Sequence, residues 1–264
     1  MPLFFAFLIG QSALAHEVWL QPQKYQVEKN GAITASIKNG EGFEGIELGW
    51  FSGRMEVFDK IVRGKRSKLE GRAGDLPAVQ GLITKPGLVV LLYQSRPQTL
   101  TYETWEKFLS FIDHKDLSND LPKKLLPDIA DLPPRELYTR HAKSLVAVGH
   151  GKGKDENTGL EAEIVALANP YRDDMSAGLP IRVVYQGMPR PDTQVELFER
   201  APNGAVSIQK LRTDANGRLV LPVKPGHEYL VDSVVLRPAS RDLADQYKVA
   251  IETLWAALTF RVPD

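Results

Sequence analysis

The sequence predicts a mostly β protein with two β-sandwich-like domains and a short helical insertion in the N-terminal one. Short apolar runs alternate with turn residues along most of the chain. The runs are most regular in the second half, where their spacing is typical of a β-sandwich. Apolar residues make up 43% of the 264 residues and charged residues 25%, which is the balance of an ordinary globular protein that can bury a substantial core.

Residues 1–15 have the features of a secretory signal peptide. An apolar run covers residues 3–9, and Ser12, Ala13 and Ala15 give the small-residue pattern that signal peptidase cleaves. We therefore expect the mature chain to begin at His16 and the protein to be periplasmic or otherwise exported. A buried N-terminal strand or helix is the alternative. The segment is shorter than a membrane span of roughly 20 residues, and no transmembrane segment is expected in the mature chain.

The first predicted domain covers residues 16–150 and is β-rich. Residues 32–37 and 87–93 are apolar runs bounded by turn signals, which predicts strands. Between about residues 103 and 134 the pattern changes, because Trp105, Phe108 and Ile112 recur at helical spacing. This segment is the predicted helical insertion.

The second predicted domain covers residues 160–264. It follows the polar, glycine-rich segment 150–159, which we interpret as a linker or long loop. A short helix or an excursion between strands is expected within residues 242–257. The predicted strands are residues 163–167, 179–185, 193–198, 206–211, 219–223, 229–235 and 255–262.

Charge and cysteine content exclude several classes of function. Lys and Arg together number 33, as do Asp and Glu, so the formal net charge is zero and we expect no nucleic-acid partner. The absence of cysteine excludes disulfide scaffolds, thiolate metal sites and cysteine nucleophiles. The chain has no phosphate loop, nucleophile elbow or His-Glu-x-x-His motif. We therefore expect a protein that is not an enzyme.

His16 is the most informative single residue. As a mature N-terminus it would present an α-amine and an imidazole together, and two such nitrogens can chelate Ni(II), Co(II) or Cu(II). The amine has a pKa near 8 in its ordinary state, so a metal can displace its proton at neutral pH. Glu17 is a candidate oxygen ligand beside it. Alternatively, His16 is simply the residue after the cleavage site.

Two other histidines are candidates for completing such a site. His141 lies among the closely spaced polar residues 136–143, an unusual density beside an apolar run, although a solvated strand face is the alternative. His114 lies at the end of the predicted helix, where a protonated histidine would also be favoured by the helix dipole.

Two parts of the chain resemble a known family. The predicted mature start reads His-Glu-Val-Trp-Leu-Gln-Pro from His16. It resembles the opening His-(Asp/Glu)-x-Trp-Leu-x-Pro of periplasmic proteins with the domain of unknown function 4198. The second half matches in order at residues 160–165, 169–171, 187–189, 213–218 and 225–226.

The resemblance implies a role and a fold. Members are commonly described as periplasmic components of nickel or cobalt uptake, which implies a membrane metal transporter as partner. Their C-terminal halves resemble transthyretin-like or prealbumin-like sandwiches. His16 matches the opening motif and is therefore implied as a ligand, whereas a second ligand is not fixed.

Three hypotheses follow. A metal-binding protein predicts that His16 converges with His114 or His141. A non-enzymatic cell-envelope interaction or carbohydrate-binding module predicts exposed aromatic residues on one face or loop cluster, and the candidates are Trp50, Phe51, Tyr171 and Tyr185. An enzyme, such as a copper oxygenase with a histidine brace, needs the same metal site with an open coordination position beside a substrate surface.

Overall fold

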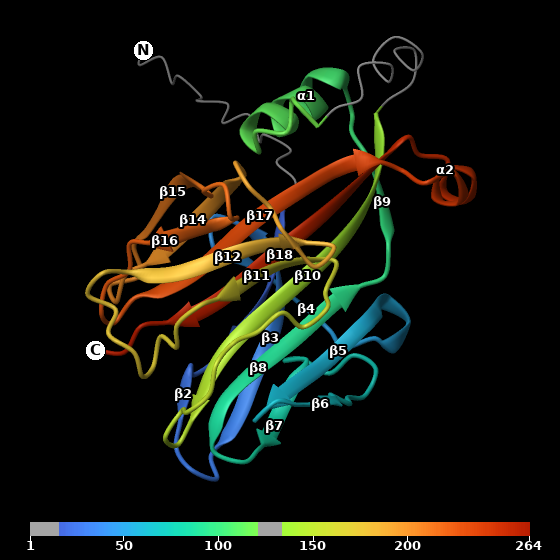
Figure 1. The fold of residues 1–264 in the computed structure, drawn as a ribbon. Coiled ribbons are helices and arrows are strands. Elements are labelled where there is room, and N and C mark those ends of the chain that lie inside the picture. The colour runs from blue at the N-terminus through green and yellow to red at the C-terminus, as the bar shows by residue number, and fades with distance from the viewer. Residues whose placement is uncertain (1–15, 121–133) are drawn as a thin grey trace, which may run out of the picture.

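The computed structural model describes residues 16–120 and 134–264, so the predicted signal peptide lies outside the described residues. The expected mostly β fold is confirmed, and the predicted helical insertion is α1 (Trp105–His114) (Figure 1). A second short helix, α2 (Arg241–Tyr247), lies within the segment where one was expected, and η1 (Ser52–Arg54) is a single 3-10 turn. The strands are β1 (Glu17–Pro22), β2 (Gln26–Val27), β3 (Ala32–Glu41), β4 (Glu44–Leu48), β5 (Met55–Val62), β6 (Lys65–Lys68), β7 (Val79–Ile83), β8 (Gly87–Ser95), β9 (Gln98–Thr101), β10 (Arg135–Val148), β11 (Ala162–Ala166), β12 (Leu179–Tyr185), β13 (Met188–Pro189), β14 (Gln194–Arg200), β15 (Val206–Arg212), β16 (Arg218–Leu221), β17 (Glu228–Pro238) and β18 (Ile251–Arg261).

A ten-stranded sheet runs through the middle of the molecule. Its order is β15-β14-β17-β18-β10-β8-β5-β6, and β2 and β9 also pair with β10. The long strands β10, β17 and β18 run side by side (Figure 1). β10 pairs with β18 in parallel, from Glu136 opposite Ile251 to Ser144 opposite Thr259. This pairing joins the two halves of the chain in one sheet.

Two four-stranded sheets cover the opposite faces of this central sheet. One contains β1, β3, β4 and β7, and the other contains β11, β12, β13 and β16. Successive side chains of β8 pack alternately in the two cores on opposite faces of the central sheet. Leu88, Val90 and Leu92 belong to the core shared with the second small sheet, whereas Val89 and Leu91 belong to the core shared with the first. A strand buried on both faces must be apolar at every position, which explains the unbroken apolar run in the sequence.

Both large cores contain residues from both halves of the chain. Phe198, Leu230 and Ala257 of the second half pack in the core beneath β1 and β3. Leu88 and Leu145 of the first half pack in the core beneath β11 and β12. The division into residues 16–150 and 160–264 therefore stays a prediction, and the sheet and both cores continue across it.

The predicted linker, residues 150–159, is a loop held against the fold. The Leu88 amide donates to the Lys152 carbonyl at 2.8 Å. Asp155 is buried, and its carboxylate lies 2.7 Å from the ammonium of Lys143 on β10. The same ammonium lies 2.8 Å from the carboxylate of Glu163 on β11. The loop is thus fixed to strands on both of its sides.

The helix α1 begins and ends with recognisable signals. The Thr104 hydroxyl accepts a hydrogen bond from the Lys107 amide at 3.3 Å, which satisfies one of the free amides of the first turn. Phe108, Phe111 and Ile112 are buried, and Phe111 stacks on Trp255 of β18 with ring centroids 5.6 Å apart. The helix ends at His114. Lys115 is its C-cap residue, and the Lys115 side chain is buried. No helix among the described residues has the length and apolar character needed to cross a membrane.

Candidate functional site

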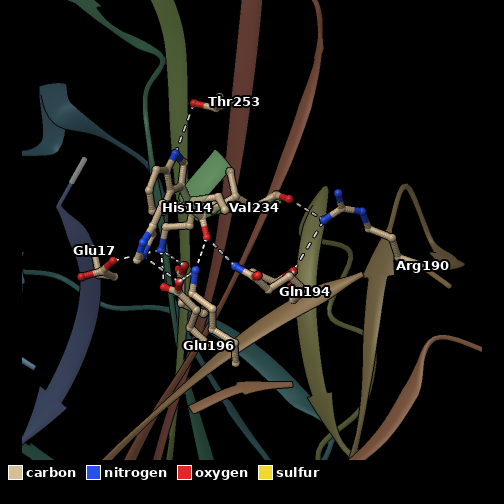
Figure 2. A network of polar contacts seen from close by, with 12 residues as sticks. Glu17, His114, Arg190, Gln194, Glu196, Val234 and Thr253 are labelled. Atoms are coloured by element: carbon tan, nitrogen blue, oxygen red, sulfur yellow. Dashed lines mark hydrogen bonds and ion pairs between the residues drawn. The ribbon is translucent and has the colours of Figure 1, made fainter. Parts of the chain in front are cut away.

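A buried charged cluster joins the end of α1 to three strands. The Lys115 ammonium contacts carboxylates of Glu17 on β1, Glu196 on β14 and Asp232 on β17, at 3.1, 2.6 and 2.9 Å. Each of these residues is at most 6% exposed. Figure 2 shows the side chains of Glu17, His114 and Glu196 gathered around this point. Residues far apart in the sequence thus form one compact network.

Three carboxylates share one ammonium in this cluster. Burial disfavours the charged form of Lys115, but the surrounding carboxylates outweigh burial and raise its pKa, so it stays protonated. Burial raises the pKa of Glu17 to about 7 against the attraction of Lys115. Burial also raises the pKa of Asp232. The cluster therefore holds protons more readily than free carboxylates do.

His114 lies at the edge of the same cluster. Its Nε2 is 2.9 Å from Glu196 Oε1, and its backbone carbonyl accepts hydrogen bonds from Gln194 at 2.8 Å and Lys210 at 2.5 Å. Burial lowers the pKa of His114 despite the attraction of Glu196. The structure thus brings two predicted ligands, Glu17 and His114, to one cluster.

The acidic cluster does not fit a metal ion as it is folded. Carboxylate oxygens of Glu17, Glu196 and Asp232 lie within 4.8 Å of one another, a spacing that suits oxygen ligands of one cation. The Lys115 ammonium, however, already contacts all three residues. A divalent ion would have to displace this buried ammonium, and the cluster therefore acts as an internal ion network.

His16 lies in a different place, at a cavity of about 410 Å³. It is exposed and directly precedes β1. The polar residues of the cavity wall include Asn39, Glu103 and Arg140. The remaining walls are mostly apolar or aromatic, and they include Val18, Ile37, Leu48, Met55, Leu100, Tyr93, Tyr102 and Tyr138. A mostly apolar hollow with a few polar groups is typical of small-ligand sites.

Arg140 stands between this cavity and the charged cluster. Its guanidinium carbon lies 3.8 Å from the centroid of the Trp255 ring, and the Lys115 ammonium lies 4.8 Å from the same centroid. The Arg140 side chain is buried, and its Nε and Nη1 have no hydrogen-bond partner among the described residues. The two sites therefore adjoin through Trp255.

His141 does not join either site. It neighbours Arg140 on β10, and successive side chains of a strand point to opposite faces of the sheet. Its Nδ1 donates to the Trp255 carbonyl at 3.1 Å, and its Nε2 is buried with no partner in the described part of the chain. Burial lowers the pKa of His141 to about 4, so it is neutral. Thus His16, His114 and His141 occupy three separate places, and the predicted convergence of His16 with His114 or His141 is wrong.

The aromatic residues expected on an exposed binding face are largely covered. Among Trp50, Phe51, Tyr171 and Tyr185, only Phe51 is exposed, at 40%. The Tyr171 hydroxyl donates to the Leu145 carbonyl at 2.5 Å, and the Tyr185 hydroxyl accepts from Arg237 at 2.8 Å. These four residues do not provide the exposed aromatic cluster that a carbohydrate-binding surface would need.

Sequence reasoning did not predict the roles of Lys115, Glu196, Asp232 and Arg140. The pattern around Glu196 was misleading, because its alternation with Val195 and Leu197 predicts a solvent-facing side chain, whereas the structure buries it. The polar density of residues 136–143 was noted, and Arg140 belongs to it. No local pattern connects Lys115 to its three partners, since their pairing depends on the tertiary fold.

The sequence profile of the family described as "Domain of unknown function (DUF4198)" matches residues 13–236. A comparison with curated proteins gives no match. The match covers most of the chain and includes β1 and the strands that supply the charged cluster. The chain therefore belongs to the family defined by domain of unknown function 4198.

Proposed function

We propose that this chain is an exported, periplasmic metal-binding protein without enzymatic activity, and that it serves nickel, cobalt or copper uptake. The mature N-terminal residue His16 is the principal ligand. The observation that carries the proposal is the position of His16, exposed and at the wall of a cavity directly before β1. A strand that pairs with β3 along its whole length from Glu17 holds this residue in a defined place.

The chemistry of the donors supports a borderline metal. Cleavage before His16 supplies an α-amine and an imidazole on one residue, and Ni(II), Co(II) and Cu(II) favour such nitrogen ligands. Asn39 lines the same cavity and offers an amide oxygen atom. Glu17 is not needed as a ligand, because its carboxylate pairs with Lys115. His114 is paired with Glu196.

The proposed partner is a membrane metal transporter that takes the ion from His16. This part rests on the family resemblance and on exposure of His16, since an exposed ligand can pass its ion to another protein. The proposed export follows from the signal-like pattern of residues 1–15.

Native mass spectrometry of the exported protein tests this function. After exposure to Ni, Co or Cu, we expect a chain that starts at His16 and carries one metal ion, which a chelator removes. His16→Ala should lose the ion, whereas His150→Ala and His114→Ala should keep it. Retention of the metal by His16→Ala would refute the assignment of the ligand, and a wild-type chain that starts at His16 and keeps no metal would refute the function.

A further inference from the structure

The Arg140 guanidinium is a buried cation with unused hydrogen-bond donors at a cavity wall. It is 6% exposed, and its Nε and Nη1 have no partner among the described residues. Its backbone is fixed, because the Arg140 amide donates to the Ser95 hydroxyl at 3.0 Å. An unpaired buried donor is costly, so these atoms call for a partner that the described residues do not supply, such as a water molecule or a ligand.

The rings around Arg140 hold the guanidinium in position. It packs against Trp255 at 3.8 Å and against Tyr138 at 5.0 Å, measured to the ring centroids. The Tyr138 hydroxyl in turn donates to Gln98 at 3.0 Å. A planar guanidinium stacked in this way is oriented before any ligand arrives, which reduces the entropy cost of binding.

The charges of the cavity wall favour an anion. Arg54 and Arg140 both line the cavity. Glu103 also lines it, but its carboxylate is paired with Lys107 at 2.5 Å. Glu136 is buried close to Arg140 and has no ion pair with it, and burial raises the pKa of Glu136 to about 7, which weakens its competition for the guanidinium. Buried Glu136, Asp232 and Glu17 attract the Arg140 guanidinium and partly compensate its charge, although none of them forms an ion pair with it. Arg54 adds a second positive charge to the same wall.

The remaining wall is suited to an organic body. Tyr93, Tyr102 and Tyr138 contribute aromatic surface, and Leu48 and Leu100 contribute aliphatic surface. A volume of about 410 Å³ accommodates a small organic molecule. We propose that this cavity binds a small organic carboxylate, with the positive charge of Arg140 attracting the carboxylate and the tyrosines packing against its apolar body. The inference does not depend on the proposed metal, although His16 lines the same cavity.

Isothermal titration calorimetry with a matched pair of probes tests the inference. The exported wild-type protein, freed of metal by a chelator and dialysis, is titrated with 3-phenylpropionate and with its neutral analogue 3-phenylpropionamide. We expect saturable binding of the carboxylate and at least tenfold weaker binding of the amide. Equal binding of the two probes, or binding of neither, would overturn the inference.

Variants locate the binding at this cavity. Arg140→Gln should lose the preference for the carboxylate, whereas Arg66→Gln, an exposed arginine outside the cavity, should bind as the wild type does. Leu48→Trp fills the cavity and leaves Arg140 intact, so it should abolish binding without lowering the thermal unfolding temperature. Wild-type affinity in a folded Leu48→Trp protein would show that the probe binds elsewhere and would refute the site.

Discussion

At the scale of single residues, the protein depends on buried charges more than its neutral composition suggests. Lys115 contacts three buried carboxylates from three strands. Arg140 packs against the ring of Trp255, which Lys115 also contacts. Buried charges are tolerated only when they are paired, because each loses its hydration on folding. Substitutions that remove one member of this buried charge network should therefore lower the stability of the protein most.

Lys115→Met should destabilise the protein strongly. It leaves Glu17, Glu196 and Asp232 buried without their shared ammonium, and breaking a buried ion pair from one side costs about 3–5 kcal/mol. Urea unfolding measures the change. The matched control is Lys107→Met, which removes an exposed pair with Glu103 and should change stability by less than about 1 kcal/mol. Equal effects of the two substitutions would contradict the importance of the cluster.

Glu136 should make stability fall as pH rises. Burial raises the pKa of this fully buried carboxyl from its ordinary 4.5 to about 7. Because the folded state binds the proton more tightly than the unfolded state, its contribution is complete below about pH 4.5 and is lost as pH rises through 7. Urea unfolding between pH 5 and pH 8 should show this fall, and Glu136→Gln should reduce it. The same slope in the variant would assign the pH dependence to other groups.

At the scale of elements, most strands of the second half and α1 were predictable, whereas most of the first-half strands and the state of the 150–159 segment were not. Alternation and turn residues identified β12 at its observed bounds, and the helical spacing of Trp105, Phe108 and Ile112 identified the position of α1. The glycine-rich composition of 150–159 gave no sign that Asp155 would be buried against Lys143. A glycine-rich composition indicates that a segment is flexible in isolation. This loop is instead fixed by contacts with residues on separate strands.

The loop should therefore become susceptible to proteolysis when its anchor is removed. Lys143→Met leaves Asp155 and Glu163 buried without their ammonium, so the loop should open more often. Limited trypsin digestion should cut the variant faster after Lys152 or Lys154 than it cuts the wild type. Lys24→Met, a change at an exposed lysine, is the control and should leave the rate unchanged. Rapid cutting of the wild-type loop would show that the anchor does not restrain it.

In the candidate site too, features set by neighbouring residues could be predicted from the sequence, whereas contacts between distant residues could not. His16 and Glu17 could be selected from the signal pattern before them, and Arg140 lies in a segment whose polar density is visible in the sequence. The partners of Lys115 lie at residues 17, 196 and 232, so only the fold brings them together. His141 illustrates the reverse case, because a one-residue step along β10 turns its side chain away from the face that Arg140 occupies.

At the scale of the whole molecule, the ten-stranded sheet should make unfolding a single event. β10 and β18 pair at nine successive positions, from Glu136 opposite Ile251 to Ser144 opposite Thr259. Both large cores also contain residues from each side of the predicted domain boundary. Separation of the halves would expose core residues of each. Urea unfolding followed by fluorescence and by circular dichroism should give coincident transitions. Two separate transitions would instead support independent domains at 16–150 and 160–264.

The central claim is that His16 binds a transition metal as the N-terminal residue of the exported protein. Electron paramagnetic resonance of that protein with an equimolar amount of Cu(II) tests it most directly, because hyperfine structure identifies nitrogen ligands. We expect coordination by an imidazole nitrogen together with the α-amine in the wild type and in His150→Ala, whereas His16→Ala should lose the imidazole nitrogen and keep at most the amine. An identical spectrum from His16→Ala, or a wild-type spectrum of Cu(II) with oxygen ligands alone, would contradict the account.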